Sequence, residues 1–327
     1  MISIVMPVKN ASLYLKECLD SITNQTLDDW ELIAVNDHST DSSKTLLTDY
    51  ALKDSRIRIF ENTGKGIIDA LSLAYSKSKG EFISRMDADD KMAERKLELM
   101  LENLLLNPES IITAKVAYFS AKELGQGYLN YEKWLNNFID KQNHYEGIYQ
   151  ECVLPSPCWM MSRVTLDLLG GFKSLNYPED YDLCFKAYQA KINIIGINQT
   201  LHHWRDYSER TSRNDPNYAN NTFIEMKTSY FLRCDYRQEL PLILWGAGKK
   251  GKNIAQLLLN ENIDFVWATN NPKKLNAPIY GKELSLDSSI SDIQNAQLII
   301  AIADRTASEG ILRVLEASKH KEVYYFC

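Results

Sequence analysis

The 327-residue sequence lacks the features of membrane, secreted and nucleic-acid-coating proteins. No apolar run approaches the roughly 20 residues that a membrane-spanning helix needs. The apolar start at residues 2–6 is too short for a secretory signal and has no basic segment before it. A net charge of −6 gives no general attraction to polyanions. We therefore expect a cytoplasmic protein with no integral membrane contact.

Glycine, proline and cysteine are also sparse, at 14, 9 and 6 residues. Together with 45% hydrophobic residues, this composition argues against a disordered or low-complexity chain. The cysteines show neither the paired spacing of a zinc site nor a CxxC redox motif, so we interpret them as reduced thiols. What the sequence does contain is apolar material for two cores, and its length favours two domains.

The order of apolar and amphipathic segments predicts a first α/β unit with a mostly parallel sheet. The predicted strands lie at residues 2–6, 31–35, 57–61, 81–86 and 193–197. The predicted helices lie at residues 11–24, 41–51, 66–77, 91–106, 180–190 and 222–233. Residues 111–177 are less regular, and we assign most of their aromatic side chains to core packing.

A second, smaller α/β unit is predicted where the strand pattern restarts at residue 242. Its predicted strands are 242–245, 265–268, 298–303 and 323–326, with helices up to 259 and at 307–318. We therefore divide the chain into residues 1–237 and an accessory, Rossmann-like domain at 238–327.

Three glycines follow the first strand of that second unit and open its helix: Gly246, Gly248 and Gly251. In this context the GxGxxG pattern can hold a phosphate at a helix N-terminus. The acid that would bind a ribose about 20 residues later is absent, because residues 269–272 read TNNP. We interpret the glycines as serving tight helix–strand packing, and we expect no NAD.

Polar residues gather where three strands of the first unit end, at residues 7–10, 36–41 and 85–90. Ligands of open α/β sheets bind beyond the carboxyl ends of the strands, so these segments are the candidate site. Asp87, Asp89 and Asp90 place three like charges within four residues, which a hard divalent cation would compensate. The alternative is a solvated acidic loop that caps the following helix.

Two adjacent acids, Glu179 and Asp180, open a later predicted helix. Acids at a helix start are favoured by the helix dipole, which is one explanation for them. The other is that one of them acts as a general base toward an acceptor hydroxyl.

Five segments in this order resemble the family 2 glycosyltransferases of the GT-A fold. They are SIVMPVKN at 3–10, NQT at 24–26, WELIAVNDHSTD at 30–41, MDADD at 86–90 and PEDYD at 178–182. The resemblance covers about the first 215 residues. It implies a nucleotide-diphospho-sugar transferase sheet with helices on both faces, and a metal-dependent hexosyl transfer with inversion.

The resemblance also implies roles for individual residues. Asp180 corresponds to the catalytic base, Asp37 to a contact with the nucleotide base, and Asp87 and Asp89 to the pair that serves ribose and metal, Mn²⁺ or Mg²⁺. A UDP-sugar is the expected donor. The remaining predicted nucleotide-sugar contacts are Pro7, Val8, Asn10, Arg85, Ala88, Glu179 and Arg205. Arg85 and Arg205 are assigned to the diphosphate because a guanidinium matches phosphate oxygens, and the alternative for both is surface or structural pairing.

Two departures from the family pattern concern the base of the donor. Lys9 stands where an aromatic residue commonly stacks on the base, and Asn36 replaces the first acid of a paired motif. The sequence leaves two further functions open. One is an inactive nucleotide-binding regulatory protein, which these substitutions allow, and the second is a nicotinamide-dependent oxidoreductase built around Gly246.

The acceptor is a glycan, a small molecule or a tRNA. The tail segments at 244–251 and 324–327 are similar to a branch of the family that acts on queuosine-modified tRNA. A local basic surface for tRNA could come from Arg205, Arg210, Arg213, Lys227, Arg233 and Arg237. The overall acidic charge instead favours a glycan or small-molecule acceptor.

Overall fold

The computed structural model describes residues 1–173, 178–208, 210, 223–302 and 322–327. The chain forms two compact units. The first comprises Met1–Glu146 and Cys152–Thr211, and the second comprises Gly147–Glu151 and Ser212–Cys327. The division of the chain at residue 237/238 stays a prediction.

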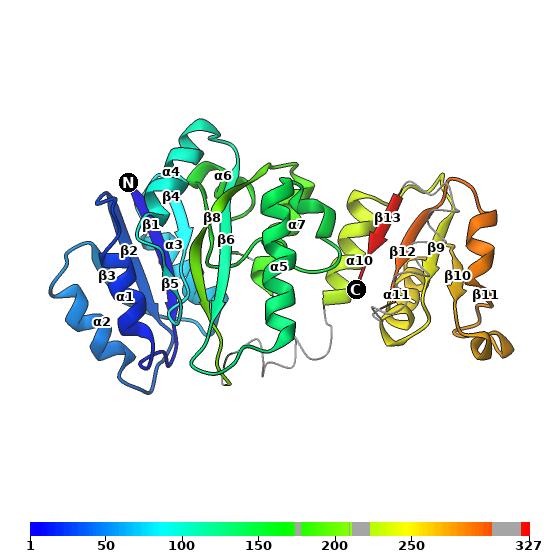
Figure 1. Cartoon of the computed structure of the whole chain (residues 1–327), viewed down its shortest axis with the longest axis horizontal. Coiled ribbons are helices and arrows are strands. Elements are labelled where there is room, and N and C mark those ends of the chain that lie inside the picture. The colour runs from blue at the N-terminus through cyan, green and yellow to red at the C-terminus, as the bar shows by residue number, and fades with distance from the viewer. Residues whose placement is uncertain (174–177, 209, 211–222, 303–321) are drawn as a thin grey trace. The chain divides into compact units, whose positions relative to one another are not determined.

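The first unit is built on an eight-stranded, mostly parallel sheet with the order β3-β2-β1-β4-β7-β6-β8-β5 (Figure 1). Its strands are β1 (Ile2–Val8), β2 (Trp30–Asn36), β3 (Ile57–Glu61), β4 (Phe82–Arg85), β5 (Lys91–Met92), β6 (Ile111–Phe119), β7 (Trp159–Ser162) and β8 (Ile194–Arg205). The pairs β1–β2, β1–β4, β2–β3 and β6–β8 are parallel, whereas β5 and β7 run antiparallel to their neighbours.

Seven α-helices are described in this part of the chain. They are α1 (Leu15–Thr23), α2 (Ser43–Ala51), α3 (Ile67–Lys77), α4 (Lys96–Leu106), α5 (Gln126–Lys141), α6 (Arg163–Leu168) and α7 (Glu179–Gln189), and a 3₁₀ turn, η1 (His144–Gly147), follows α5. Residues of β1 alternate between the two faces of the sheet. Ile2, Ile4, Met6 and Val8 join one core cluster with residues of α1, α2 and α4.

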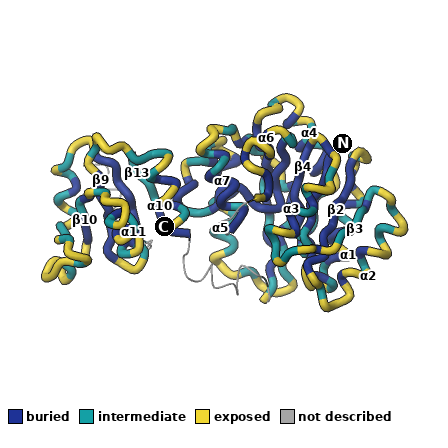
Figure 2. The backbone as a smooth tube through the Cα atoms, turned by 180° about the vertical axis from the view of Figure 1, so that it is seen from behind, coloured by how far each residue is buried: buried dark blue, intermediate teal, exposed yellow. Residues whose placement is uncertain are grey.

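The burial pattern follows from this arrangement. Strands β1, β2 and β4 are buried along almost their whole length (Figure 2). Helix α1 buries one face, whereas α7 is buried on nearly all sides. In α1 the buried residues Leu15, Cys18, Leu19 and Ile22 recur at helical spacing. Since both faces of the central strands are apolar, the sheet is covered on both sides. The predicted fold class is confirmed.

Three local predictions in the first unit differ from the structure. The strand expected at 193–197 continues to Arg205 in β8. The helix expected at 91–106 begins at Lys96, because Lys91 and Met92 form β5 and pair with β8. Residues 111–177, expected to be less regular, contain β6, α5, β7 and α6. Several aromatic residues of this region, such as Trp159 and Phe138, are buried in the core.

The second unit contains a five-stranded, fully parallel sheet with the order β11-β10-β9-β12-β13. Its strands are β9 (Leu242–Trp245), β10 (Val266–Thr269), β11 (Leu284–Leu286), β12 (Gln297–Ile300) and β13 (Glu322–Tyr325). Its helices are α10 (Phe223–Cys234) and α11 (Lys249–Asn260), with the 3₁₀ turns η2 (Pro272–Asn276) and η3 (Asp287–Asp292). The predicted helix at 307–318 lies outside the described residues.

The glycine-rich turn joins β9 to α11. Gly246 has φ +123°, which an L-residue rarely adopts. A Cβ on Gly251 would overlap the carbonyl oxygen of Gly246, whereas a Cβ on Gly248 would meet open space. Gly246 is therefore required by its backbone conformation and Gly251 by close packing, and neither requirement involves a ligand. None of the helices in the described ranges has the length and apolarity to cross a lipid bilayer.

Candidate functional site

The candidate site lies at the carboxyl edge of three adjacent parallel strands. Strand β1 pairs with β2 up to Val8–Asn36 and with β4 up to Val5–Arg85. The segments that follow these strands therefore emerge side by side, as expected for ligand-binding loops of an open α/β sheet. Of the predicted residues, Pro7 and Val8 are the last two of β1, and Asn10 lies in the segment that follows.

Asp37 is held firmly at this edge and is only 3% exposed. Its carboxylate accepts hydrogen bonds from Asn62 Nδ2 at 2.7 Å and Gly66 N at 3.1 Å, and it pairs with Lys9 Nζ at 3.2 Å. Burial alone would raise the pKa of Asp37, but these donors lower it below its usual value. Lys9, the residue that departs from the family pattern, thus contacts the predicted base-binding acid.

The other departure, Asn36, is also accounted for by its contacts. Its side chain is buried, and Nδ2 donates to Glu61 Oε2 at 2.8 Å. Its Oδ1 accepts the backbone N–H of Ser39 at 3.3 Å. An amide supplies both the donor and the acceptor that these partners require, whereas an ionised carboxylate would supply no donor for Glu61.

The acidic turn after β4 places two carboxylates at the site. Asp87 Oδ1 accepts from Arg85 Nε at 3.0 Å, and Asp89 Oδ2 accepts from Tyr207 Oη at 2.9 Å. Burial, together with the charges of Asp90 and Asp87, raises the pKa of Asp89 to about 7. A bound cation would favour the ionised form of this carboxylate.

The donor set fits a hard divalent cation. Within the described ranges, no group of three or more His, Cys, Asp or Glu side chains is arranged to hold a metal ion. Mg²⁺ and Mn²⁺ are commonly held by one or two carboxylates, with water and substrate phosphates completing the shell. Asp87 and Asp89 provide that number of carboxylates, and Ala88 is the buried residue between them.

Arg85 joins this turn to the start of helix α7. Its guanidinium, 5% exposed, donates through Nη1 to Glu179 Oε1 at 2.8 Å while Nε holds Asp87. Burial raises the pKa of Glu179, although Arg85 opposes that shift. The buried guanidinium of Arg85 therefore connects the acidic turn with the Glu179–Asp180 pair.

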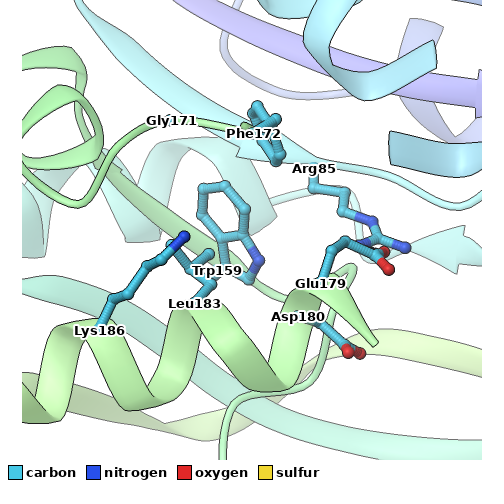
Figure 3. Close-up of a pocket in the computed structure, with 8 residues that line it drawn as sticks. All are labelled: Arg85, Trp159, Gly171, Phe172, Glu179, Asp180, Leu183 and Lys186. Atoms are coloured by element: carbon cyan, nitrogen blue, oxygen red, sulfur yellow. Dashed lines mark hydrogen bonds and ion pairs between the residues drawn. The ribbon is translucent and has the colours of Figure 1, made fainter. Parts of the chain in front are cut away.

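Asp180 is half-buried at the N-terminal turn of α7. Its Oδ2 accepts the hydroxyl of Ser156, and its Oδ1 accepts the backbone N–H of Tyr181 at 2.8 Å. Glu179 turns toward Arg85, and Asp180 points the other way from the helix start (Figure 3). The two adjacent acids consequently have different partners.

A pocket lies beside these acids (Figure 3). It is lined by Arg85, Trp159, Gly171, Phe172, Glu179, Asp180, Leu183 and Lys186. Lys186 Nζ pairs with the buried Asp182 at 2.7 Å. The pocket thus combines aromatic surface with charged groups of both signs next to Asp180.

Arg205 contacts the acidic turn from strand β8. Its Nε donates to the carbonyl of Asp89 at 2.7 Å, and its Nη2 pairs with Glu17 at 3.1 Å. Its side chain is 12% exposed. The guanidinium also lies over the rings of Tyr14 and Phe119. Arg205 therefore lies at the site, but its described guanidinium contacts are all to protein groups, and its phosphate contact stays a prediction.

Several residues that hold the site together were assigned no role in it from the sequence. Ser156, Asn62 and Tyr207 bond to Asp180, Asp37 and Asp89, and the partners are 24, 25 and 118 residues apart in the chain. No spacing rule connects such residues. Lys227 does not contribute to the basic surface that was considered for tRNA, because it is 4% exposed and donates to the carbonyl of Gln150 at 2.7 Å. Arg213, another residue of that predicted surface, lies outside the described residues.

The family model described as Glycosyl transferase family 2 matches residues 3–169. An uncharacterized glycosyltransferase of Rickettsia bellii is 28% identical over 240 residues, covering 72% of this chain and 33% of that protein. Glycosyltransferase GlyA of Streptococcus pneumoniae is 27% identical over 212 residues, covering 62% and 30%. The chain spans about a third of the length of these curated relatives.

Solved structures share the fold. TarS 1-349 of S. aureus in complex with UDP has a TM-score of 0.55 at 16% identity, covering 80% of this chain and 71% of that one. The mannosyltransferase PcManGT from Pyrobaculum calidifontis, in complex with GDP-Man and Mn²⁺, has a TM-score of 0.53 at 17% identity, covering 71% and 63%.

Proposed function

The chain belongs to glycosyl transferase family 2 and is a glycosyltransferase, and on this premise we propose an inverting, metal-dependent transfer of a hexosyl group from a nucleotide diphosphate to an acceptor hydroxyl. The observation that carries the proposal is the position of Arg85. It contacts Asp87 of the acidic turn and Glu179, the neighbour of Asp180. The turn proposed to bind the donor and the helix start that carries the proposed base therefore lie next to each other, which supports a single displacement.

In the proposed reaction Asp180 accepts the proton of the acceptor hydroxyl. The acceptor oxygen forms a bond to the anomeric carbon as the bond from that carbon to the diphosphate oxygen breaks. Ser156 and the N–H of Tyr181 orient the carboxylate for this role. A divalent cation held by Asp87 and Asp89 would supply Lewis-acid stabilisation of the leaving diphosphate.

We propose UDP as the nucleotide of the donor. TarS has been solved with UDP and with UDP-GlcNAc, and PcManGT with GDP-Man. Asp37, the residue proposed to contact the base, is held in place by Asn62, the backbone of Gly66 and Lys9.

For the acceptor we propose a glycan or small molecule whose hydroxyl approaches Asp180. The overall acidic charge of the chain favours these acceptors over a polyanion. Burial of Lys227 weakens the case for the alternative acceptor, a queuosine-modified tRNA. The proposal includes a cytoplasmic location, which six free thiols support.

The test is calorimetric titration of the purified chain with UDP, GDP and their sugar conjugates, with Mn²⁺ and with chelator. We expect one nucleotide to bind in a metal-dependent manner and its sugar conjugate to be slowly hydrolysed. An Asp89→Ala variant should lose the effect of Mn²⁺ on binding, because one of the two carboxylates is gone. Nucleotide binding without any hydrolysis or transfer across an acceptor panel would favour an inactive, regulatory protein.

A further inference from the structure

Three ionisable side chains are buried beneath the acidic turn, and the proposed reaction uses none of them. Lys96 and His202 are fully buried, and Asp90 is 1% exposed. Lys96 is the first residue of α4, His202 lies on β8, and Asp90 closes the turn that carries Asp87 and Asp89. A fully buried lysine is rare unless its charge is paired, so its contacts indicate its role.

One set of contacts connects Lys96 with the acidic turn. Lys96 Nζ lies 3.2 Å from His202 Nδ1, and His202 Nε2 lies 3.0 Å from Asp90 Oδ2. Asp90 Oδ1 accepts the backbone N–H of Arg205 at 2.8 Å. The backbone N–H of Asp90 donates to the carbonyl of Asp87 at 3.3 Å, which closes the turn.

A second contact connects Lys96 with the candidate base. Lys96 Nζ donates to the carbonyl of Pro157 at 2.6 Å. Pro157 directly follows Ser156, whose hydroxyl bonds to Asp180. Prolines at 155 and 157 restrict the backbone on both sides of Ser156, so a constraint on the Pro157 carbonyl is transmitted to that serine.

These contacts indicate positioning more strongly than stability. Buried charge networks often add no net stability, because an apolar side chain of the same volume avoids their desolvation cost. Resting on the proposed function, we propose that Lys96 is a positioning residue for the transfer. Its ammonium fixes the position of the acidic turn relative to the Ser156–Asp180 pair. Lys96 acts through its neighbours and touches neither donor nor acceptor.

The test compares Lys96→Met with Lys227→Met. Both lysines are buried and both donate to a backbone carbonyl, but Lys227 belongs to the second unit. We expect Lys96→Met to lower kcat at least about tenfold and to raise the Mn²⁺ concentration for half-maximal rate several-fold. Lys227→Met should keep both within about twofold. A Lys96→Met enzyme with the kcat of the wild type would overturn the proposal.

A double-mutant cycle separates positioning from a general loss of structure. If Lys96 acts through Pro157 and Ser156, the losses in kcat from Lys96→Met and Ser156→Ala should be less than multiplicative in the double variant. Fully multiplicative losses would contradict the connection to the base. Should Lys96→Met fail to fold, His202→Gln removes only the contact between Lys96 and Asp90 that passes through His202. This variant should raise the Mn²⁺ requirement more than it lowers kcat at saturating metal. A His202→Gln enzyme with an unchanged Mn²⁺ requirement would contradict the proposed connection from Lys96 through His202 to the acidic turn.

Hydrogen exchange keeps this inference distinct from the proposed function. The amide of Asp90 bonds to Asp87, and that of Cys158 bonds to the carbonyl of Pro155 at 2.9 Å. In folded Lys96→Met, peptides containing both amides should exchange faster, and in Lys227→Met they should not. A wild-type chain without transfer or hydrolysis would refute the proposed function alone. Unchanged exchange in Lys96→Met would refute the role of Lys96.

Discussion

At the residue scale, Asp180 differs from its neighbour Glu179 in what surrounds it. Glu179 is neutralised by a buried arginine, whereas the described contacts of Asp180 are hydrogen bonds from a hydroxyl and a backbone amide. Those two neutral donors orient the carboxylate of Asp180, and its described hydrogen bonds include none from a lysine or an arginine. Adjacent acids on one helix turn thereby have different surroundings, and only Asp180 is proposed to act as the base.

We expect Asp180→Asn to lower kcat by about 10² to 10⁴ while the Kd for the nucleotide changes by less than about threefold. The amide has the same shape and can still accept from Ser156, but it cannot take a proton. Steady-state rates and calorimetry measure the two quantities. Ser156→Ala is the matched control, with a smaller loss. Full activity of Asp180→Asn would mean that another group is the base.

His144 carries a pH-dependent contribution to stability. It is 3% exposed, and neither ring nitrogen has a hydrogen-bond partner among the described residues. Burial lowers its pKa from 6.5 to about 4. The unfolded chain therefore binds more protons than the folded chain once the pH falls below about 6.5. The resulting stability is present above that pH and is lost as the pH falls toward 4.

The corresponding prediction compares wild type with His144→Leu by denaturant unfolding at pH 7.5 and pH 5. The wild type should lose about 2 kcal/mol more than the variant between these pH values, because only the wild type must protonate a buried imidazole. An equal loss in both proteins would show that other groups account for the acid sensitivity.

At the scale of elements, the turn between β9 and α11 depends on one glycine more than on its neighbour. A Cβ at Gly251 would meet the carbonyl of Gly246, which is backbone and cannot turn aside. We expect Gly251→Ala to destabilise the second unit by about 3 kcal/mol, from overpacking. Gly248→Ala, in open space at φ −75°, should cost only about 1 kcal/mol, because alanine is a poorer N-cap than glycine.

Thermal unfolding followed in the second unit, through the fluorescence of Trp245 and Trp267, measures this difference. Both tryptophans lie in its sheet and are about 1% exposed. If the two alanine variants had the same stability, the close helix–strand contact would not be what requires Gly251.

At the scale of the whole molecule, the residues proposed for donor and base all precede residue 206, within the first unit. The second unit includes a short segment at 147–151 and helix α10, whose aromatic residues pack on the last strand. Tyr149 stacks on Phe326 with ring centroids 5.1 Å apart, and Phe231 meets Tyr324 at 4.9 Å.

A chain ending at residue 237 should therefore bind nucleotide with a Kd within about threefold of the full chain, but it should expose Tyr149 and Phe231. We expect it to bind a hydrophobic dye and to aggregate more readily. A chain ending at residue 211 lacks Phe231 as well and should bind less dye. Loss of nucleotide binding in either shortened chain would mean that the C-terminal domain is needed for the donor site.

The sequence by itself determined the alternation of strands and helices, the mostly parallel sheet, the family and the strand ends where polar residues gather. These follow from short-range periodicity and from local motifs such as MDADD, which need no knowledge of distant residues. The predicted segments at 57–61 and 242–245 coincide with β3 and β9. The assigned roles of the site residues remain predictions.

Only the tertiary structure decided which side chains hold the site together. Lys9 pairs with Asp37, Ser156 bonds to Asp180, and Lys96 reaches both the acidic turn and the strand segment before β7. Such partners are 24 or more residues apart, and many residues of the same type lie between them. Packing of the sheet and its helices selects one partner among them, and that choice depends on three-dimensional distance, which no local pattern encodes.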